Sequence, residues 1–161
     1  MARQERSAGI LLFRLAAAEP ELLLVHPGGP FWERRDLGAW SIPKGRIEDG
    51  EDPRECALRE LGEELGPHAP RLEIEQLLEL GTVRQRSGKL VEAWAAEADF
   101  DPARLASNTF PLEWPPRSGR TQEVPEVDRA QWFGPAEAGR RILAAQDAFV
   151  ERLLRLLDER P

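Results

Sequence analysis

Runs of apolar residues divide the chain into strands grouped around one helix. Residues 7–15 and 21–26 are two runs rich in Leu and Ile, separated by a short segment with Ala and Pro. Apolar runs bounded by turn residues are typical of buried strands. Residues 72–83 and 90–100 predict a second pair of strands, with Gly88 favouring a tight turn between them. Residues 126–133 predict a last strand.

The helix is expected between Asp52 and Leu65. Asp52 can accept hydrogen bonds from the free backbone donors at a helix start, and Pro53 fits the first turn, where no N–H is needed. Gly66 and Pro67 predict the end, because glycine accepts the terminating conformation and proline cannot continue a helix.

The rest of the pattern predicts a long loop and a second helical region. Residues 101–121 contain four prolines and are expected to be irregular. After Pro135, apolar residues recur at helical spacing and predict a C-terminal helix with one face on the sheet: Ile142, Phe149, Leu153 and Leu156. Strands before and after a central helix favour an α+β fold, a mixed αβα sandwich, with one domain over residues 1–161.

Composition and charge exclude several functional classes. With 22 Lys and Arg against 29 Asp and Glu, the net charge of −7 argues against broad binding of duplex nucleic acid. The apolar runs are too short to span a bilayer, and no apolar signal segment follows the first residues, so we expect a cytoplasmic protein without membrane contact. One Cys and two His exclude a multi-Cys or His-rich metal site.

The negative charge is concentrated in residues 45–66, which hold eight acids and three bases, a local net charge of −5. At 100° per residue, Glu60, Glu63 and Glu64 fall on one helix face, and the leucines fall on the other. Like charges at i,i+4 destabilise a helix by a few tenths of a kcal/mol, which favours a site for a hard cation such as Mg²⁺ or Mn²⁺. On the helix alone, a solvated acidic face remains the commoner alternative.

Residues 45–66 resemble the Nudix box. The spacing is Gly, five residues, Glu, seven residues, Arg-Glu, an aliphatic residue, any residue, Glu-Glu, any residue and Gly; only Pro67 departs, where the family prefers an aliphatic residue. The chain is similar to the MutT-like Nudix hydrolases. Residues 27–32 and 40–45 extend the similarity to a bacterial subgroup of predicted nucleoside triphosphate or dinucleoside polyphosphate pyrophosphohydrolases.

The resemblance implies a role for each matching residue. The Mg²⁺ ligands would be three helix acids, Glu60, Glu63 and Glu64, and the backbone carbonyl of Gly45. Glu63 and Glu64 would also be catalytic. Arg59 and Glu51 would orient the catalytic helix. Lys44, beside the glycine ligand, is a candidate to hold a phosphate, although a bare surface lysine would fit the pattern equally well.

The resemblance implies Mg²⁺-dependent hydrolysis of a diphosphate linkage in a nucleoside diphosphate derivative by metal-activated water, with nucleoside triphosphates or dinucleoside polyphosphates as first candidates. One alternative is a Nudix-fold sensor that binds nucleotides without cleaving them, which the intact box argues against. Another is removal of pyrophosphate from RNA 5′ ends, which needs a basic groove. The oligomeric state stays open, a homodimer included.

The general base and the substrate contacts lie outside the box. In the family the base is a box glutamate or an acid from a loop; here Glu123 is the first choice among the loop acids, which also include Glu113 and Glu126. Trp114, with Arg117 and Arg120 close behind, could stack on a base and hold phosphate. We therefore expect residues 107–121 to select the substrate, although loop aromatics often only anchor a loop.

Overall fold

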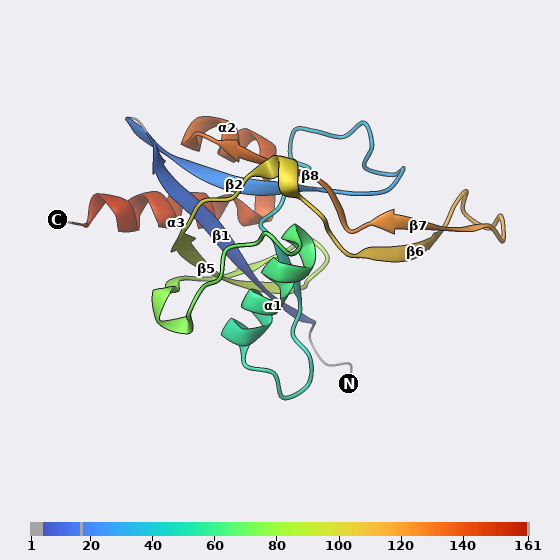
Figure 1. The fold of residues 1–161 in the computed structure, drawn as a ribbon, viewed down its shortest axis with the longest axis horizontal. Coiled ribbons are helices and arrows are strands. Elements are labelled where there is room, and N and C mark those ends of the chain that lie inside the picture. The colour runs from blue at the N-terminus through green and yellow to red at the C-terminus, as the bar shows by residue number, and fades with distance from the viewer. Residues whose placement is uncertain (1–4, 17, 161) are drawn as a thin grey trace.

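The described residues of this computed structural model, 5–16 and 18–160, form a mixed β-sheet between helices (Figure 1). The strands are β1 (Arg6–Ala16), β2 (Glu19–Pro27), β3 (Lys44–Arg46), β4 (Leu78–Arg84), β5 (Leu90–Glu97), β6 (Thr109–Glu113), β7 (Thr121–Pro125) and β8 (Val127–Phe133). The helices are α1 (Pro53–Leu65), α2 (Pro135–Arg141) and α3 (Asp147–Asp158), with short 3₁₀ turns at Ile74–Gln76, Pro102–Arg104 and Ala144–Gln146.

Strand β1 lies at the centre of the main sheet. The strand order is β4-β5-β1-β2-β8, and β3 also pairs with β1. β1 runs parallel to β5 and antiparallel to β2 and β3, which makes the sheet mixed, as predicted.

Side chains of β1 alternate between two cores. Ile10 and Leu12 belong to the cluster that packs under α1, whereas Leu11 and Phe13 belong to the opposite cluster, together with Phe149 of α3. A strand covered on both faces needs no polar alternation, which explains its unbroken apolar run. Helix α1 therefore covers one face and α2 and α3 the other, and the predicted α+β sandwich is confirmed.

Helix α1 begins and ends where the sequence predicts. The Asp52 side chain accepts a hydrogen bond from the backbone N–H of Arg54 at 2.8 Å, and Pro53 is the first helical residue. Gly66 follows the last residue with φ of +94°. A Cβ at Gly66 would lie 2.5 Å from the carbonyl oxygen of Ala106, so both conformation and space require glycine.

The predicted pair of strands at residues 72–83 and 90–100 is present as the antiparallel pair β4 and β5. β4 begins later than predicted, because residues 74–76 form a 3₁₀ turn. The strand lies at the edge of the sheet and bulges between Glu79 and Gly81. Across this bulge, Nη1 of Arg152 in α3 donates to the carbonyl oxygens of Leu80 and Thr82 at 3.0 and 3.2 Å.

The prediction of an irregular loop over residues 101–121 is wrong in its second half. Strand β6 pairs with β7 in a two-stranded antiparallel sheet, with residues 114–120 as its turn. Pro111 in β6 is tolerated because both strands of such a ribbon are edge strands, where a missing N–H need not break a ladder. Figure 1 shows this hairpin projecting from the main sheet, with its turn at the outer end.

The C-terminal region contains two helices where one was predicted. Phe149 and Leu153 of α3 are buried on the sheet, as expected. Ile142 is also buried, but it lies at the end of α2 in an extended conformation with ψ of 149°. The apolar spacing correctly predicted that these residues share one core, although the helix is interrupted between Ile142 and Phe149.

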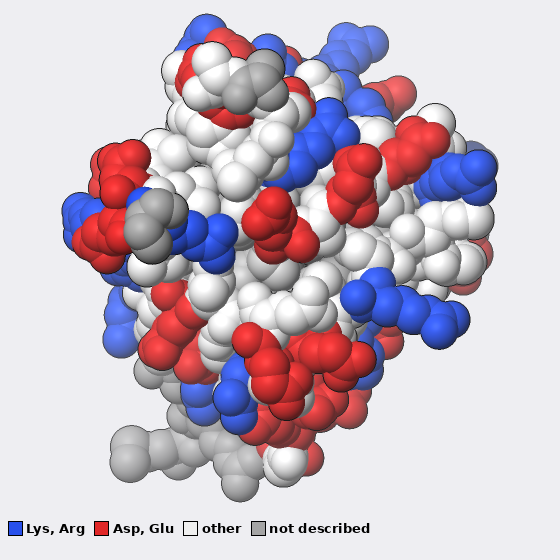
Figure 2. Space-filling view, turned by 60° about the vertical axis from the view of Figure 1, so that its left-hand side comes forward, with Lys and Arg blue, Asp and Glu red and all other residues white. Residues whose placement is uncertain are grey.

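Charged side chains are unevenly distributed over the surface. Figure 2 shows acidic side chains gathered at the lower end of one face, at the height of α1 and its preceding loop in Figure 1. Elsewhere on that face, Lys and Arg alternate with Asp and Glu. Among the helices of residues 5–16 and 18–160, none has the length and apolar character to cross a membrane.

Candidate active site

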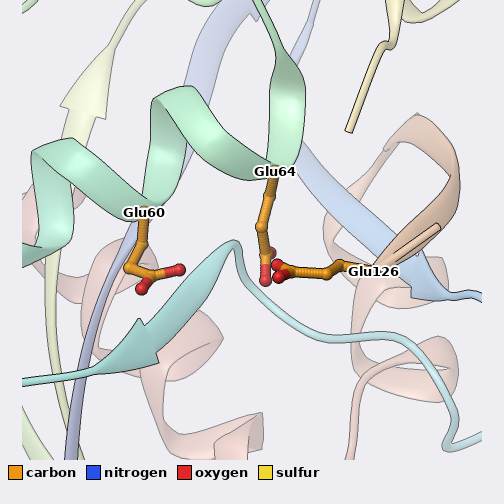
Figure 3. A group of neighbouring side chains, drawn as sticks. All are labelled: Glu60, Glu64 and Glu126. Atoms are coloured by element: carbon orange, nitrogen blue, oxygen red, sulfur yellow. The ribbon is translucent and has the colours of Figure 1, made fainter. Parts of the chain in front are cut away.

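Three carboxylates, two from helix α1 and one from the junction of β7 and β8, point into one small volume (Figure 3). Glu60 and Glu64 lie one turn apart on α1, and Glu126 directly precedes β8. One oxygen of each lies within 4.8 Å of the others. Oxygen ligands of one Mg²⁺ lie about 3 to 4 Å apart, given bonds of about 2.1 Å. Small side-chain movements would therefore let the three bind one cation.

Strand β3 supplies a glycine against which the Glu60 side chain packs. Gly45 pairs with Ala8 of β1, and Glu60 is only 8% exposed. A Cβ on Gly45 would overlap the carboxyl group of Glu60. Only glycine therefore allows the carboxylate and the β3 main chain to approach this closely, and the structure places Gly45 beside the acids that it was predicted to accompany.

Lys44 lies beside Glu64 at this site. Its backbone N–H donates to Oε1 of Glu64 at 3.3 Å. Burial raises the pKa of Glu64 to about 8; the Lys44 charge opposes this shift and the Glu60 charge adds to it. Burial lowers the pKa of Lys44, against the attraction of Glu64.

The other two acids of the group are affected in the same direction as Glu64. Burial, followed by repulsion from Glu63, raises the pKa of both Glu60 and Glu126. Burial and mutual repulsion thus disfavour the charged carboxylates, and a bound divalent cation would offset both effects.

Arg59 and Glu51 form the pair that the sequence predicted. Nε and Nη2 of Arg59 donate to the two carboxylate oxygens of Glu51 at 2.8 and 3.0 Å. These hydrogen bonds, with one from the backbone N–H of Glu48, lower the pKa of Glu51 to about 2. Nη1 of Arg59 donates to Glu60 at 2.9 Å, and Nη2 donates to the carbonyl oxygen of Arg46 at 3.2 Å. The guanidinium therefore ties α1, its preceding loop and β3 together.

Two predicted acids lie outside the carboxylate group. Glu63 accepts hydrogen bonds from Arg59 at 3.3 Å and is not one of the three clustered acids. Glu123, the first choice for a general base, is exposed on β7 and accepts a hydrogen bond from Thr109 at 3.0 Å. Glu126 is the loop acid that the structure brings to the helix. The sequence had ranked it behind Glu123, since nothing in the sequence showed which side of the strand would face α1.

A cavity of about 240 Å³ opens beside the carboxylates. Lys44, Glu64 and Glu126 line it together with apolar side chains and Trp32. The sequence analysis gave Trp32 no role of its own, although residues 27–32 carried part of the family resemblance.

Of the residues that were expected to bind the substrate, Lys44 lines this cavity and the three residues of the hairpin do not. Trp114, Arg117 and Arg120 lie in the β6–β7 turn and do not line this cavity. The base of the same hairpin does adjoin the site, because the backbone N–H of Asn108 donates to the carbonyl oxygen of Glu63 at 2.9 Å.

Comparison with known proteins places this arrangement in a family. The NUDIX domain family model matches residues 3–156, nearly the whole chain. The chain belongs to the Nudix family. The resemblance seen in the box and the preceding residues is thereby confirmed, and family membership supports the expected enzyme class, a Nudix pyrophosphohydrolase.

Curated relatives match this Nudix chain over a short segment. An RNA pyrophosphohydrolase of Dinoroseobacter shibae is 54% identical over 39 residues, and Nudix hydrolase 25 of Arabidopsis thaliana is 66% identical over 29 residues. These segments cover 24% and 18% of this chain, and 24% and 17% of the relatives. The aligned parts thus span a quarter or less of each relative.

Solved Nudix structures share the fold across the chain. The Ap4A hydrolase of C. elegans aligns with a TM-score of 0.62 and 22% identity, covering 94% of this chain and 98% of that one. The NUDIX domain of Shewanella oneidensis NrtR, complexed with ADP ribose, aligns with a TM-score of 0.64 and 20% identity, covering 98% and 90%. At these identities the comparison shows the fold.

Proposed function

We propose that this protein hydrolyses a diphosphate linkage in a nucleoside diphosphate derivative with the help of Mg²⁺, Mn²⁺ being the alternative ion. The main support is the group of Glu60, Glu64 and Glu126, whose oxygens lie within 4.8 Å of one another beside a cavity. A nucleotide sensor without turnover would not need to keep three clustered, partly buried carboxylates, which cost stability when no cation is bound.

The donor set fits a hard cation. All the side chains of the group offer carboxylate oxygens, the ligands that Mg²⁺ prefers. Glu60, Glu64 and Glu126 would hold the metal, joined by the Gly45 carbonyl and by Glu63 once it turns from Arg59. When bound, divalent cations would supply positive charge to the diphosphate, lower the pKa of the attacking water and stabilise charge on the leaving phosphate.

The remaining residues position the substrate and the helix. Lys44 shares the cavity with Glu64 and would attract a phosphate of the substrate. The bidentate Arg59–Glu51 pair holds α1 against β3 and so keeps Glu60 beside Gly45. Among the loop acids, Glu126 is better placed than Glu123 to accept a proton from an attacking water, because only Glu126 faces the helix acids.

Removal of pyrophosphate from RNA 5′ ends is a second candidate. The short segments that match RNA pyrophosphohydrolases favour it. The net charge of −7 and the alternating charges in Figure 2 argue against a basic groove that would bind the phosphate backbone of RNA.

A substrate panel with one matched pair of variants tests the proposal. Nucleoside triphosphates, dinucleoside polyphosphates, ADP-ribose, nucleotide sugars and 5′-triphosphate RNA are incubated with the protein at millimolar Mg²⁺. Glu64→Gln should lower kcat on the best substrate by at least about 100-fold. Glu55→Gln, an exposed acid on the same helix, should retain wild-type turnover. A wild-type protein that binds nucleotides and turns over none of the panel would instead identify a sensor.

A further inference from the structure

The cavity beside the carboxylates has an aromatic wall that the proposed chemistry does not use. Trp32 lines it together with Lys44, Glu64 and Glu126. A group attached to a diphosphate that is bound through a cation at these acids would therefore share the cavity with the indole ring. The other walls are mostly apolar, with Val25 among them.

Polar groups of Ser41, Ile42 and Val25 in these walls are engaged in internal hydrogen bonds. The Ser41 hydroxyl donates to the carbonyl oxygen of Ile42 at 2.7 Å and accepts from Nε2 of Gln146 at 3.1 Å. The backbone N–H of Ile42 donates to Oε1 of Gln146 at 3.0 Å, and Ser41 exchanges two backbone hydrogen bonds with Val25. These walls therefore offer few free hydrogen-bond donors or acceptors to the edge of a base.

Trp32 is held in place before any ligand arrives. The backbone N–H of Trp32 donates to the carbonyl oxygen of Gly29 at 3.2 Å, and the backbone carbonyl oxygen of Trp32 accepts from the backbone N–H of Arg35 at 2.9 Å. The Arg35 carbonyl oxygen lies 2.6 Å from Nε2 of the fully buried His26, and the Phe31 ring packs edge-on at 5.1 Å. The loop is thus tied to β2, and a stacked ligand would pay little ordering entropy.

We propose that Trp32 stacks on the nucleobase of the substrate and that the protein accepts all common bases. This inference rests on the proposed function and names its recognition group. Stacking is tolerant of base identity because every base has a π-face, whereas strong discrimination needs hydrogen bonds to the base. The values of kcat/KM for ATP, GTP, CTP and UTP should therefore agree within about tenfold.

The experiment compares two tryptophans. Trp32→Ala should raise KM for ATP by about 5- to 150-fold, the range for loss of one base–aromatic stack, with kcat nearly constant. Trp32→Phe should recover most of the affinity. Trp114→Ala removes the same side chain from the β6–β7 turn and should leave KM unchanged. A rise in KM for Trp114→Ala with none for Trp32→Ala would overturn the proposal.

Inorganic tripolyphosphate separates stacking from general damage to the protein. It has no base, so Trp32→Ala should change its turnover by less than about twofold, whereas a misfolded variant would lose both reactions. Equal losses on ATP and tripolyphosphate, or a preference above about tenfold for one base in the wild type, would contradict the inference.

Calorimetric titration with ADP separates failure of this inference from failure of the proposed function. Weaker ADP binding to Trp32→Ala in a protein without turnover would keep the stacking role and remove the hydrolase. Turnover by the wild type together with an ADP affinity that Trp32→Ala leaves unchanged would keep the hydrolase and remove the stacking role.

Discussion

Replacing Gly45 by alanine should remove most of the activity without unfolding the protein. A Cβ built on Gly45 overlaps the carboxyl group of Glu60, so the methyl group and the carboxylate cannot keep their places. The displaced atoms are the end of a flexible side chain, which can rotate away at little cost to the fold. Gly45 has no positive φ and lies in β3 opposite Ala8, where alanine is acceptable to the backbone.

The size of the effect follows from the distance that the carboxylate must move. Restoring an ordinary contact shifts it by more than about 1 Å, and a misplacement of that size costs about 100-fold in rate. The assay is kcat/KM on the best nucleotide at saturating Mg²⁺, with the melting temperature measured on the same sample. Wild-type kcat/KM in Gly45→Ala would show that the observed place of Glu60 does not matter for catalysis.

Gly62 on α1 offers a matched control. An added Cβ there meets no atom within 4 Å. Gly62→Ala should therefore stabilise the helix by about 0.5–1 kcal/mol and leave kcat/KM unchanged.

Three further outcomes are expected. Without metal, the double variant Glu60→Gln, Glu64→Gln should melt at a higher temperature than the wild type because it removes like-charge repulsion; an equal or lower value would contradict the clustering. The pKa of Glu64 is raised to about 8 in the fold, so the metal-free protein should lose stability as the pH rises from about 5 to 8. Thermal melts of the wild type and Glu64→Gln at several pH values check this. The change of melting temperature with pH should be smaller in the variant, and smaller in the wild type when Mg²⁺ is present. Hydrolysis in ¹⁸O-labelled water should place the label in a phosphate product; label found only in a sugar hydroxyl would refute attack at phosphorus.

The helix and its acid face could be predicted because their signals are local. Asp52, Pro53 and Gly66 mark the ends of α1 by the backbone conformations that they accept, and the structure shows each in that position. The 100° spacing likewise predicted that Glu60 and Glu64 share a face. Nothing beyond the helix itself is needed for either inference.

The substrate side of the site depends on contacts that no local pattern reveals. Glu123 and Glu126 are three residues apart, and only the pairing of β7 with β6 and the turn into β8 decides which of them faces α1. The prolines around β6 concealed the hairpin that carries Trp114 outward. Trp32 reaches the cavity from a loop that His26 of β2 contacts through the carbonyl oxygen of Arg35.

The bulge in β4 has a consequence for how copies of the protein meet. An edge strand with free carbonyl oxygens and N–H groups can pair with another chain and begin aggregation. Here Arg152 occupies the carbonyl oxygens of Leu80 and Thr82, and the bulge at Gly81 breaks the regular spacing that an incoming strand would need. Removing this guanidinium should expose a template for edge-to-edge association, and any dimer of the intact protein should form through a surface other than β4.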